Sequence, residues 1–268
     1  MADKARSGGH TMEKKIGEIK AELKAAEDSM LPHFIETYAD DARSGVMAAV
    51  EQAKKRLAKL EQEKERVYRL QEYERMYAEY GMVCGIDEVG RGPLAGPVVA
   101  GAVILPKDCD ILYINDSKQL SEKKREELYD VIIERAVAVG IGRVEPQRID
   151  EINILQATYE AMRMAIKNLK VTPDILLNDA VTIPGVDIRQ VPIIKGDAKS
   201  ISIGAASIVA KVARDRLMVE YDKQMPQYGF ASNKGYGSKE HIEALKQYGP
   251  TPIHRRSFIG HFVAADAQ

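Results

Sequence analysis

The sequence of 268 residues contains no tryptophan, two cysteines and five histidines. The cysteines, Cys84 and Cys109, are too few for a disulfide framework, so we expect a cytoplasmic protein in which both are small buried hydrophobic residues. No group of cysteine and histidine has the spacing of a zinc site, and no Walker-type phosphate loop is present. These absences exclude zinc enzymes and P-loop nucleotide hydrolases.

Long apolar runs and a strong charge of one sign are also missing. No stretch approaches the roughly 20 apolar residues that cross a bilayer, and no signal-peptide pattern opens the chain, so we expect no membrane partner. The formal net charge is -1. Any contact with nucleic acid must therefore come from a local basic patch. Residues 181–268 hold 12 Lys and Arg against 8 Asp and Glu, which places the basic excess toward the C-terminus.

A change in composition near residue 80 predicts two parts, residues 1–80 and residues 81–268. Val46–Tyr80 lacks glycine and proline, and its apolar residues recur at helical spacing, which predicts one amphipathic helix of about 30 residues. A shorter helix is predicted over Met12–Glu27, and the polar first ten residues receive no role. The first part is therefore an N-terminal helical extension. We interpret its Lys54-Lys55-Arg56 cluster as a solvated helix face with glutamate partners, and a nucleic-acid contact is the alternative.

The second part mixes strands with long helices, which predicts an α/β fold with a mixed sheet flanked by helices. Ser121 is a suitable N-cap for the first of these helices. The predicted strands are Met82–Ile86, Val98–Leu105, Ala136–Val144, Ile175–Leu177 and Val186–Ile194, and the predicted helices are Ser121–Arg135, Ile149–Leu169, Ile201–Tyr221 and Ser238–Tyr248.

Four carboxylates stand where the predicted elements end. Asp87 and Glu88 follow the first strand, Asp179 follows Ile175–Leu177, and Asp197 lies between a strand and the long helix. Ligand sites in open α/β sheets gather where strand ends meet helix starts, so these acids are candidates for one site. Each also has a structural interpretation, because Asp197 can cap a helix, Asp179 can belong to a turn, and the first two can be an exposed strand end.

Carboxylates that converge repel one another and need a cation to remain ionised together. Mg²⁺ and similar hard cations prefer oxygen ligands. Two such ions about 3.5–4 Å apart can clamp the attacking water and the leaving oxygen of a phosphodiester. Spacing alone leaves the convergence of the four acids open.

The segment Gly85-Ile-Asp-Glu-Val-Gly-Arg-Gly-Pro-Leu-Ala-Gly-Pro-Val-Val99 resembles the first signature of bacterial ribonuclease HII, the type 2 ribonuclease H. Five further blocks follow in family order between Gly81 and Phe258. They are Asn115-Asp-Ser-Lys118, Leu176-Leu-Asn-Asp-Ala180, Ile194-Lys-Gly-Asp-Ala-Lys-Ser200 with Ala205-Ala-Ser-Ile-Val-Ala-Lys211, Lys234-Gly-Tyr-Gly237, and Gly249-Pro-Thr-Pro-Ile-His-Arg-Arg-Ser-Phe258.

The resemblance implies a ribonuclease H-like fold and an endoribonuclease that cuts the RNA strand of RNA–DNA hybrids and single ribonucleotides embedded in duplex DNA. It implies in-line attack by a metal-bound water, products with 3′-hydroxyl and 5′-phosphate ends, and removal of misincorporated ribonucleotides and RNA primers. The metal-binding acids carry over onto Asp87, Glu88, Asp179 and Asp197. Asp215 competes for the fourth place, but it lies within a predicted helix, and we interpret it as an ion-paired helix residue.

The resemblance also implies how the substrate is read. The turn Gly90-Arg91-Gly92 would contact the ribonucleotide at an RNA–DNA junction, because glycines allow close approach and arginine can fork onto phosphate. Tyr236 would stack against the junction nucleotide. Candidate phosphate contacts are Lys118, Lys199 and Ser200, with Arg255 and Arg256 further out along the backbone.

Several expectations complete the interpretation. The cofactor is a divalent cation, Mn²⁺ or Mg²⁺, and the partners are RNA–DNA hybrid and ribonucleotide-containing duplex DNA. We expect a monomer. A non-catalytic nucleic-acid-binding protein on the same fold is the alternative function, although all four matching acids are present. The sister type, ribonuclease HIII, is disfavoured because the helical first 80 residues do not resemble its strand-containing N-terminal domain.

Overall fold

The computed structural model describes residues 14–263, and the chain forms two compact units, Met1–Arg66 and Val67–Gln268. The first unit contains α1 (Ile16–Ala25), η1 (Asp28–Met30), α2 (Leu31–Thr37) and most of α3 (Ser44–Leu70). Apolar residues of the three α-helices form its core, and they are Ile19, Leu23, Leu31, Phe34, Val46, Ala49, Val50 and Ala53. The helical character of the extension is as predicted, and the predicted start of its first helix at Met12 lies outside the described residues.

Two details of the extension differ from the prediction. The sequence analysis missed α2, which carries Pro32 in its first turn, where a missing N–H costs nothing because that N–H has no helical partner. The long helix also does not continue to Tyr80. It ends at Leu70 and is followed by α4 (Glu72–Met76) and η2 (Ala78–Tyr80). At this break the side chain of Gln71 donates to the carbonyl of Cys109 over 2.7 Å, an attachment that sequence periodicity does not reveal.

The basic cluster on α3 has acidic partners, in agreement with its interpretation as a solvated face. Lys54 lies 2.8 Å from the carboxylate of Glu51, and Arg56 lies 2.6 Å from that of Asp28. Such surface pairs contribute little to stability.

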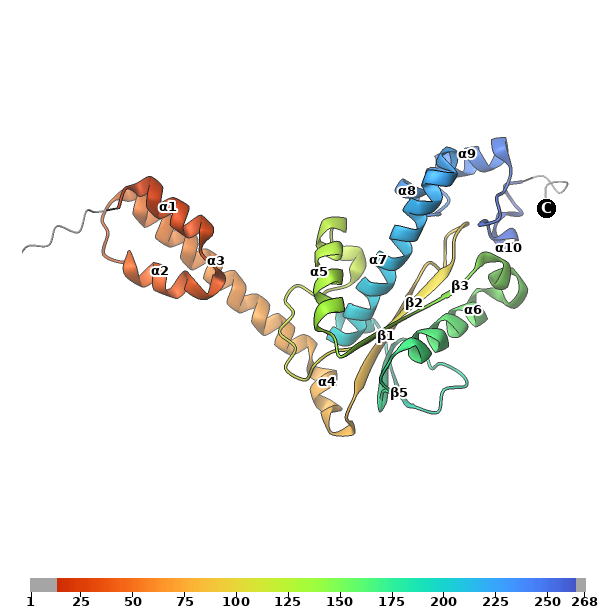
Figure 1. The fold of residues 1–268 in the computed structure, drawn as a ribbon, viewed down its shortest axis with the longest axis horizontal. Helices are drawn as coiled ribbons and strands as arrows, with labels where there is room; N and C mark the ends of the chain where they lie inside the picture. The colour runs from red at the N-terminus through yellow and green to blue at the C-terminus, as the bar shows by residue number, and fades with distance from the viewer. Residues whose placement is uncertain (1–13, 264–268) are drawn as a thin grey trace, which may run out of the picture. The chain divides into compact units, whose positions relative to one another are not determined.

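The second unit is built on a mixed sheet of five strands in the order β3-β2-β1-β4-β5 (Figure 1). The antiparallel part contains β1, β2 and β3, and β4 and β5 continue it in parallel from β1. This confirms the predicted mixed sheet. The strands are β1 (Val83–Val89), β2 (Val98–Ile104), β3 (Ala138–Val144), β4 (Ile175–Asp179) and β5 (Arg189–Ile193).

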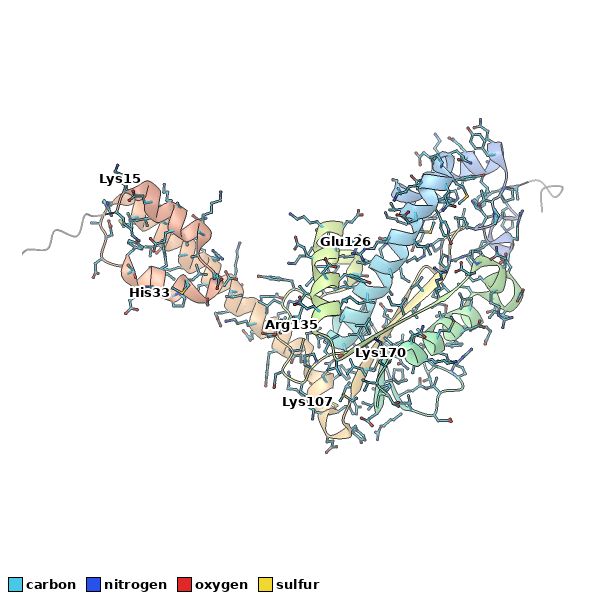
Figure 2. All side chains as sticks on the ribbon, viewed as in Figure 1. Lys15, His33, Lys107, Glu126, Arg135 and Lys170 are labelled. Carbon is cyan, nitrogen blue, oxygen red and sulfur yellow. The ribbon has the colours of Figure 1, made fainter. Side chains whose placement is uncertain are left out.

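Helices cover both faces of the sheet, as predicted (Figure 1). α6 (Pro146–Asn168) packs on one face, and α5 (Glu122–Arg135) and α7 (Ile201–Gln224) pack on the other. Glu126 of α5, labelled in Figure 2, accepts a hydrogen bond of 3.1 Å from Arg216 of α7. The remaining elements are η3 (Ser117–Gln119), η4 (Gly196–Ala198), η5 (Pro226–Tyr228), α8 (Phe230–Asn233), α9 (Lys239–Tyr248) and α10 (Arg256–Ile259).

The predicted N-cap at Ser121 is confirmed, because its side chain accepts from the amide of Lys124. The predicted helix Ile149–Leu169 is interrupted at Asn153, which has a φ of 68°. The Asn153 side chain accepts from the amides of Leu155 and Gln156 at 3.0 and 3.1 Å, so it starts the helix a second time within α6.

Helix α7 approaches the sheet at backbone distance because two glycines face it. A Cβ at Gly85 of β1 would lie 2.1 Å from the carbonyl carbon of Ser202, and one at Gly101 of β2 would lie 2.5 Å from the carbonyl oxygen of Ala206. The small residues at the start of α7 complete this contact. The beginning of α7 is thereby pressed against the centre of the sheet.

Cys84 and Cys109 are both free and buried, as predicted. Among residues 14–263, no helix is both long enough and apolar enough to cross a membrane.

Candidate active site

Asp87 and Glu88 lie on the central strand of the sheet. The sequence analysis placed them after the strand, but β1 continues to Val89, and its last residues pair with β2. Side chains alternate along a strand, so Asp87 lies on the face of Gly85, which meets α7, and Glu88 lies on the opposite face. Asp87 is 6% exposed. The two neighbouring acids therefore occupy both faces at one end of β1.

Asp179 and Asp197 come from two further segments that the sheet brings to the same end. Asp179 is the last residue of β4, which runs parallel to β1, so the carboxyl ends of both strands meet at one edge. Asp197 lies in η4, between β5 and α7. The carboxylate of Asp179 accepts a hydrogen bond of 2.7 Å from the amide of Gly196, which fastens η4 to the end of β4.

The acids influence one another electrostatically. The pKa of Asp87 is raised well above its usual value by burial and by the charges of Glu88 and Asp179, against the opposing effect of the Ser207 hydroxyl. Burial also raises the pKa of Glu88, although the nearby guanidinium of Arg91 opposes it. Both acids of β1 thus resist ionisation in the absence of a cation.

A fifth acid and a lysine belong to the same cluster. Burial raises the pKa of Asp197, and the charges of Asp116 and Asp179 raise it further. Burial lowers the pKa of Lys118, but the carboxylates around it outweigh burial and leave that pKa raised. Asp116 also accepts a hydrogen bond of 2.9 Å from the amide of Lys118. The sequence analysis included Asp116 in a signature block but assigned it no role. Only the fold brings it to the other acids.

These acids suit a hard divalent cation by their chemistry. The donors are all carboxylate oxygens, and their mutual repulsion is what a cation would relieve. Within residues 14–263, no three His, Cys, Asp or Glu side chains are already gathered closely enough to hold a metal ion.

The turn Gly90-Arg91-Gly92 follows β1 directly and lies beside Tyr236. Gly90 has a φ of 86°, which favours glycine, and Arg91 lies 3.3 Å from the carboxylate of Glu88. A Cβ on Gly92 would lie 3.7 Å from the ring of Tyr236. The Arg91 and Tyr236 side chains are 46% and 48% exposed. Two candidate substrate-reading groups are therefore adjacent, exposed and next to an acid of the cluster.

Lys199 and Ser200 have different environments in the structure. Lys199 is exposed beside η4. Ser200 is fully buried, and its hydroxyl donates to Glu74 over 2.5 Å and caps α7 by accepting from the amide of Ile203. The Ser200 hydroxyl therefore has these partners in place of the phosphate that we expected. Glu74 also accepts from the amide of Ser202 at 3.0 Å, and no sequence signal pointed to it.

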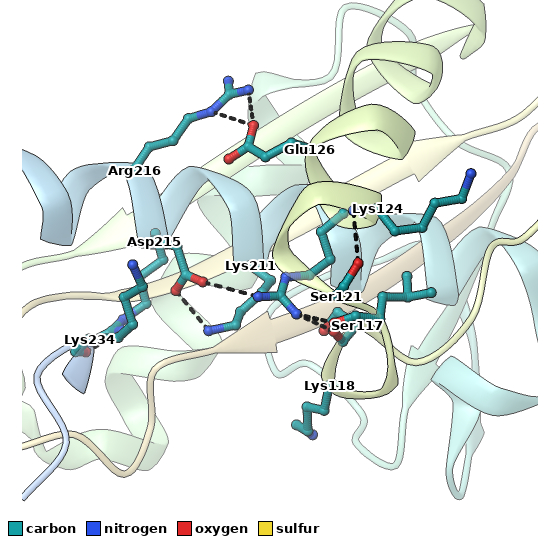
Figure 3. A network of polar contacts seen from close by, with 12 residues as sticks. Ser117, Lys118, Ser121, Lys124, Glu126, Lys211, Asp215, Arg216 and Lys234 are labelled. Carbon is teal, nitrogen blue, oxygen red and sulfur yellow. Dashed lines mark hydrogen bonds and ion pairs between the residues drawn. The ribbon is translucent and has the colours of Figure 1, made fainter. Parts of the chain in front are cut away.

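Asp215 is an ion-paired residue of α7, as interpreted from the sequence. Its carboxylate lies 2.7 Å from Lys211, as Figure 3 shows, and 3.8 Å from Arg125. The Asp215 side chain is 7% exposed. Its pairing leaves Asp197 as the better candidate for the fourth acid.

The prediction for Arg255 is wrong, and Arg256 has a different environment. Arg255 is fully buried, and its guanidinium donates to backbone carbonyls, so it cannot contact a nucleic-acid backbone. Arg256 is exposed, and its amide donates to Asp150 over 2.8 Å. Adjacent arginines in one motif thus differ completely in exposure, which their sequence does not distinguish.

Comparison with known proteins places the chain in a family. The family described as Ribonuclease HII matches residues 84–261, and that described as Ribonuclease HII N-terminal domain matches residues 15–78. The chain belongs to the ribonuclease HII family. Members are hydrolases that act as endonucleases on the RNA of RNA–DNA hybrids, leave 5′-phosphate ends and depend on divalent cations. This agrees with the resemblance found in the six sequence blocks.

Individual relatives cover most of the chain. Ribonuclease HII of Lachnoclostridium phytofermentans is 66% identical over 91% of this chain and 96% of its own length. Ribonuclease HII of Bacillus subtilis is 53% identical over 91% of this chain and 95% of its own length. The crystal structure of ribonuclease H2 from Pyrococcus horikoshii matches with a TM-score of 0.56 and 32% identity, over 65% of this chain and 92% of that one. The ribonuclease H fold predicted for the second unit is confirmed.

Proposed function

We propose that Asp87, Glu88, Asp179 and Asp197 form the catalytic centre and hold the divalent cations. When bound, such cations supply positive charge that favours deprotonation of water and stabilises the leaving oxygen of a phosphodiester. β1 and β4 carry three of the acids on hydrogen-bonded strands, so their spacing is fixed by the sheet. The fourth acid, on η4, is fastened by the bond between Gly196 and Asp179. In-line attack of water and release of a 3′-hydroxyl complete the proposed reaction.

Lys118 has a defined part in this proposal. Its pKa is raised, so it remains protonated at neutral pH. Its ammonium group faces the acid cluster and can neutralise a phosphate that enters between the carboxylates. Lys199, exposed beside η4, would contact the phosphate backbone next to that position. The proposed part of Ser200 is to hold the start of α7 through Glu74 and Ile203.

Recognition of RNA is assigned to the turn Gly90-Arg91-Gly92 and to Tyr236. A nuclease of this kind must detect the 2′-hydroxyl, the group that separates RNA from DNA. The turn offers close backbone approach, and Tyr236 beside it offers an aromatic face for a sugar or base. We propose that this pair allows incision at single ribonucleotides within duplex DNA as well as cleavage of longer hybrids.

The remaining proposals concern the state of the protein. We propose a monomer that works in the cytoplasm with Mn²⁺ or Mg²⁺, and two buried free cysteines suit a reducing compartment. We also propose a functional boundary between residues 80 and 81, with catalysis assigned to residues 81–268. The exposed basic residues of the first part would add affinity for the nucleic-acid backbone.

The observation that carries the proposal is the convergence of acids from β1, β4 and η4 at one edge of the sheet, where the amide of Gly196 bonds to Asp179. The test compares wild type with Asp87→Asn on duplex DNA containing one ribonucleotide, with and without divalent cation. Wild type should cut only with the cation, and the variant should lose several orders of magnitude in kcat. Asp187→Asn is the matched control, because Asp187 is an exposed acid outside the cluster. Cleavage without a cation, or full activity of Asp87→Asn, would refute the mechanism.

A further inference from the structure

Arg255 binds the turn that is proposed to read the ribose. Its guanidinium donates to the carbonyl of Arg91 over 2.8 Å, to that of Gly90, and to that of Gly96 over 2.8 and 2.9 Å. The Arg255 side chain is fully buried. One planar cation therefore ties the beginning of the turn to the segment that leads into β2.

Arg214 of α7 makes a parallel set of bonds to the neighbouring loop. It donates to the carbonyls of Pro97 at 2.9 Å, Lys234 at 2.8 Å and Ala95 at 3.1 Å. It too is fully buried. Lys234 stands two residues before Tyr236, so Arg214 holds the loop that presents the tyrosine. Arg214 also lies where a side chain at position 90 would be, since a Cβ there would come within 2.2 Å of its Nε.

These two cations have only carbonyl oxygens as hydrogen-bond acceptors within residues 14–263. Burying a charge without a carboxylate partner costs free energy. Burial together with the charge of Arg214 lowers the pKa of Arg255 to about 9. The carbonyls of the two loops offset this cost, and Arg255 also lies 5.1 Å from the centroid of the Phe258 ring. Both charges are therefore committed to holding loop backbone.

We propose that Arg255 and Arg214 are positioning residues that fix the turn Gly90-Arg91-Gly92 and the Tyr236 loop at the separation needed to select a ribonucleotide. This inference rests on the proposed function of the turn and of Tyr236. The reading side chains are half exposed, and their backbone is anchored from beneath by the two arginines. Binding energy can therefore be used on the 2′-hydroxyl instead of on ordering two loops.

The exchange of arginine for lysine removes the planar fork and leaves one nitrogen donor at the same position. A lysine has one nitrogen and cannot bridge three carbonyls with the planar fork of arginine. We would measure Kd without divalent cation for two duplexes of one sequence, all DNA and DNA with a single ribonucleotide. Arg255→Lys should reduce the ratio of the two Kd values by about tenfold, since hydrogen bonds to charged groups are lost. Affinity for the all-DNA duplex should stay at the wild-type value.

Two controls separate positioning from general stability. Arg163→Lys makes the same exchange at a surface arginine that donates to the carbonyl of Pro184. Leu128→Ala removes core packing in α5 without touching either loop. Both variants should leave the Kd ratio unchanged, whether or not their stability falls. Arg214→Lys should reduce the Kd ratio in the same way as Arg255→Lys. It replaces that variant in the test if Arg255→Lys does not fold.

Each outcome decides the inference. A wild-type Kd ratio in a folded Arg255→Lys or Arg214→Lys protein overturns it and leaves the proposed function intact. Failure of both variants to fold, with Leu128→Ala folded, assigns the arginines to stability alone and also overturns it. If wild type binds both duplexes equally, the ribose-reading turn itself is refuted, and the inference falls with it.

Discussion

His254 donates the hydrogen of its Nε2 to the Nε2 of His241 across 3.0 Å, and both rings are neutral. The assignment follows from the other nitrogens. The amide of Thr251 donates to Nδ1 of His254, which must therefore be an acceptor, and Nδ1 of His241 donates to the carbonyl of Tyr236. A protonated His254 would lose the bond from Thr251.

The histidine pair predicts a loss of stability in acid. Burial lowers the pKa of His254 to about 4 from an ordinary value of 6.5, and repulsion from His241 when both rings are protonated adds to this effect. The unfolded chain then binds more protons between these values, so stability is complete above pH 6.5 and falls as the pH drops toward 4. The loss should be about 2 kcal/mol at pH 5 and about 3 kcal/mol at pH 4. Urea unfolding at pH 7.5 and 5 measures it.

His254→Gln should flatten this pH dependence, and His33→Gln, at an exposed position, should not. An unchanged slope in His254→Gln would assign the acid sensitivity to other groups.

Gly85→Ala should harm both stability and catalysis. The new methyl group would lie 2.1 Å from the backbone of Ser202, so α7 must move away from the sheet. Overpacking of this kind costs about 1–3 kcal/mol. Because η4 precedes α7, Asp197 would shift from Asp87, and kcat should fall while KM for the hybrid changes less. Steady-state kinetics and thermal unfolding provide the measurements.

Gly17→Ala is the matched control, since nothing lies within 4 Å of a Cβ at that helical position. It should be neutral or slightly stabilising. Normal kcat in a folded Gly85→Ala protein would show that the spacing of α7 is not critical.

Glu74→Ala should loosen the start of α7. The substitution leaves the amide of Ser202 without its acceptor and removes the acceptor of the Ser200 hydroxyl, and unpaired buried groups cost about 1–3 kcal/mol. Hydrogen exchange of the first amides of α7 should accelerate. Glu72→Ala, at an exposed neighbouring position, should leave exchange unchanged. Equal protection in both variants would exclude this role of Glu74.

Two deletions should have different effects. Removing Met1–Arg66 should keep the second unit folded, weaken binding to the hybrid and reduce the dependence of Kd on salt, because basic side chains are lost. Removing Met1–Tyr80 should also lower the melting temperature, because Val67, Leu70 and Glu74 contribute to the core and to the start of α7. Identical salt dependence in wild type and the shorter deletion would contradict the proposed role of the extension.

The fold was largely predictable where the sequence carries local signals. The cap at Ser121 and the Val- and Ile-rich strands identified α5 and the sheet. The break at Gln71 could not be predicted, because the partner of its side chain there is the carbonyl of Cys109, far away in sequence. α2 was missed because no helix was assigned to the segment around Pro32, which stands in the first turn.

In the candidate site, too, local sequence signals were predictive and contacts between distant residues were not. Asp87, Glu88, Asp179 and Asp197 were selected because each lies near the end of an element, and that position is visible in sequence. Tertiary partners were not visible. Asp116 acts on Asp197 across 81 residues of chain, and Arg255 bonds to Gly90 across 165. Composition and periodicity contain no signal for contacts at such separations.

The bonds from Arg255 to the turn at Gly90 also order events during synthesis of the chain. All four acids precede residue 200, so a growing chain contains its complete set of cutting groups well before position 255 is translated. On the proposal made for Arg255, the turn gains its anchor only after α7, which follows Asp197, has been translated. Selectivity would be the last property that this chain acquires.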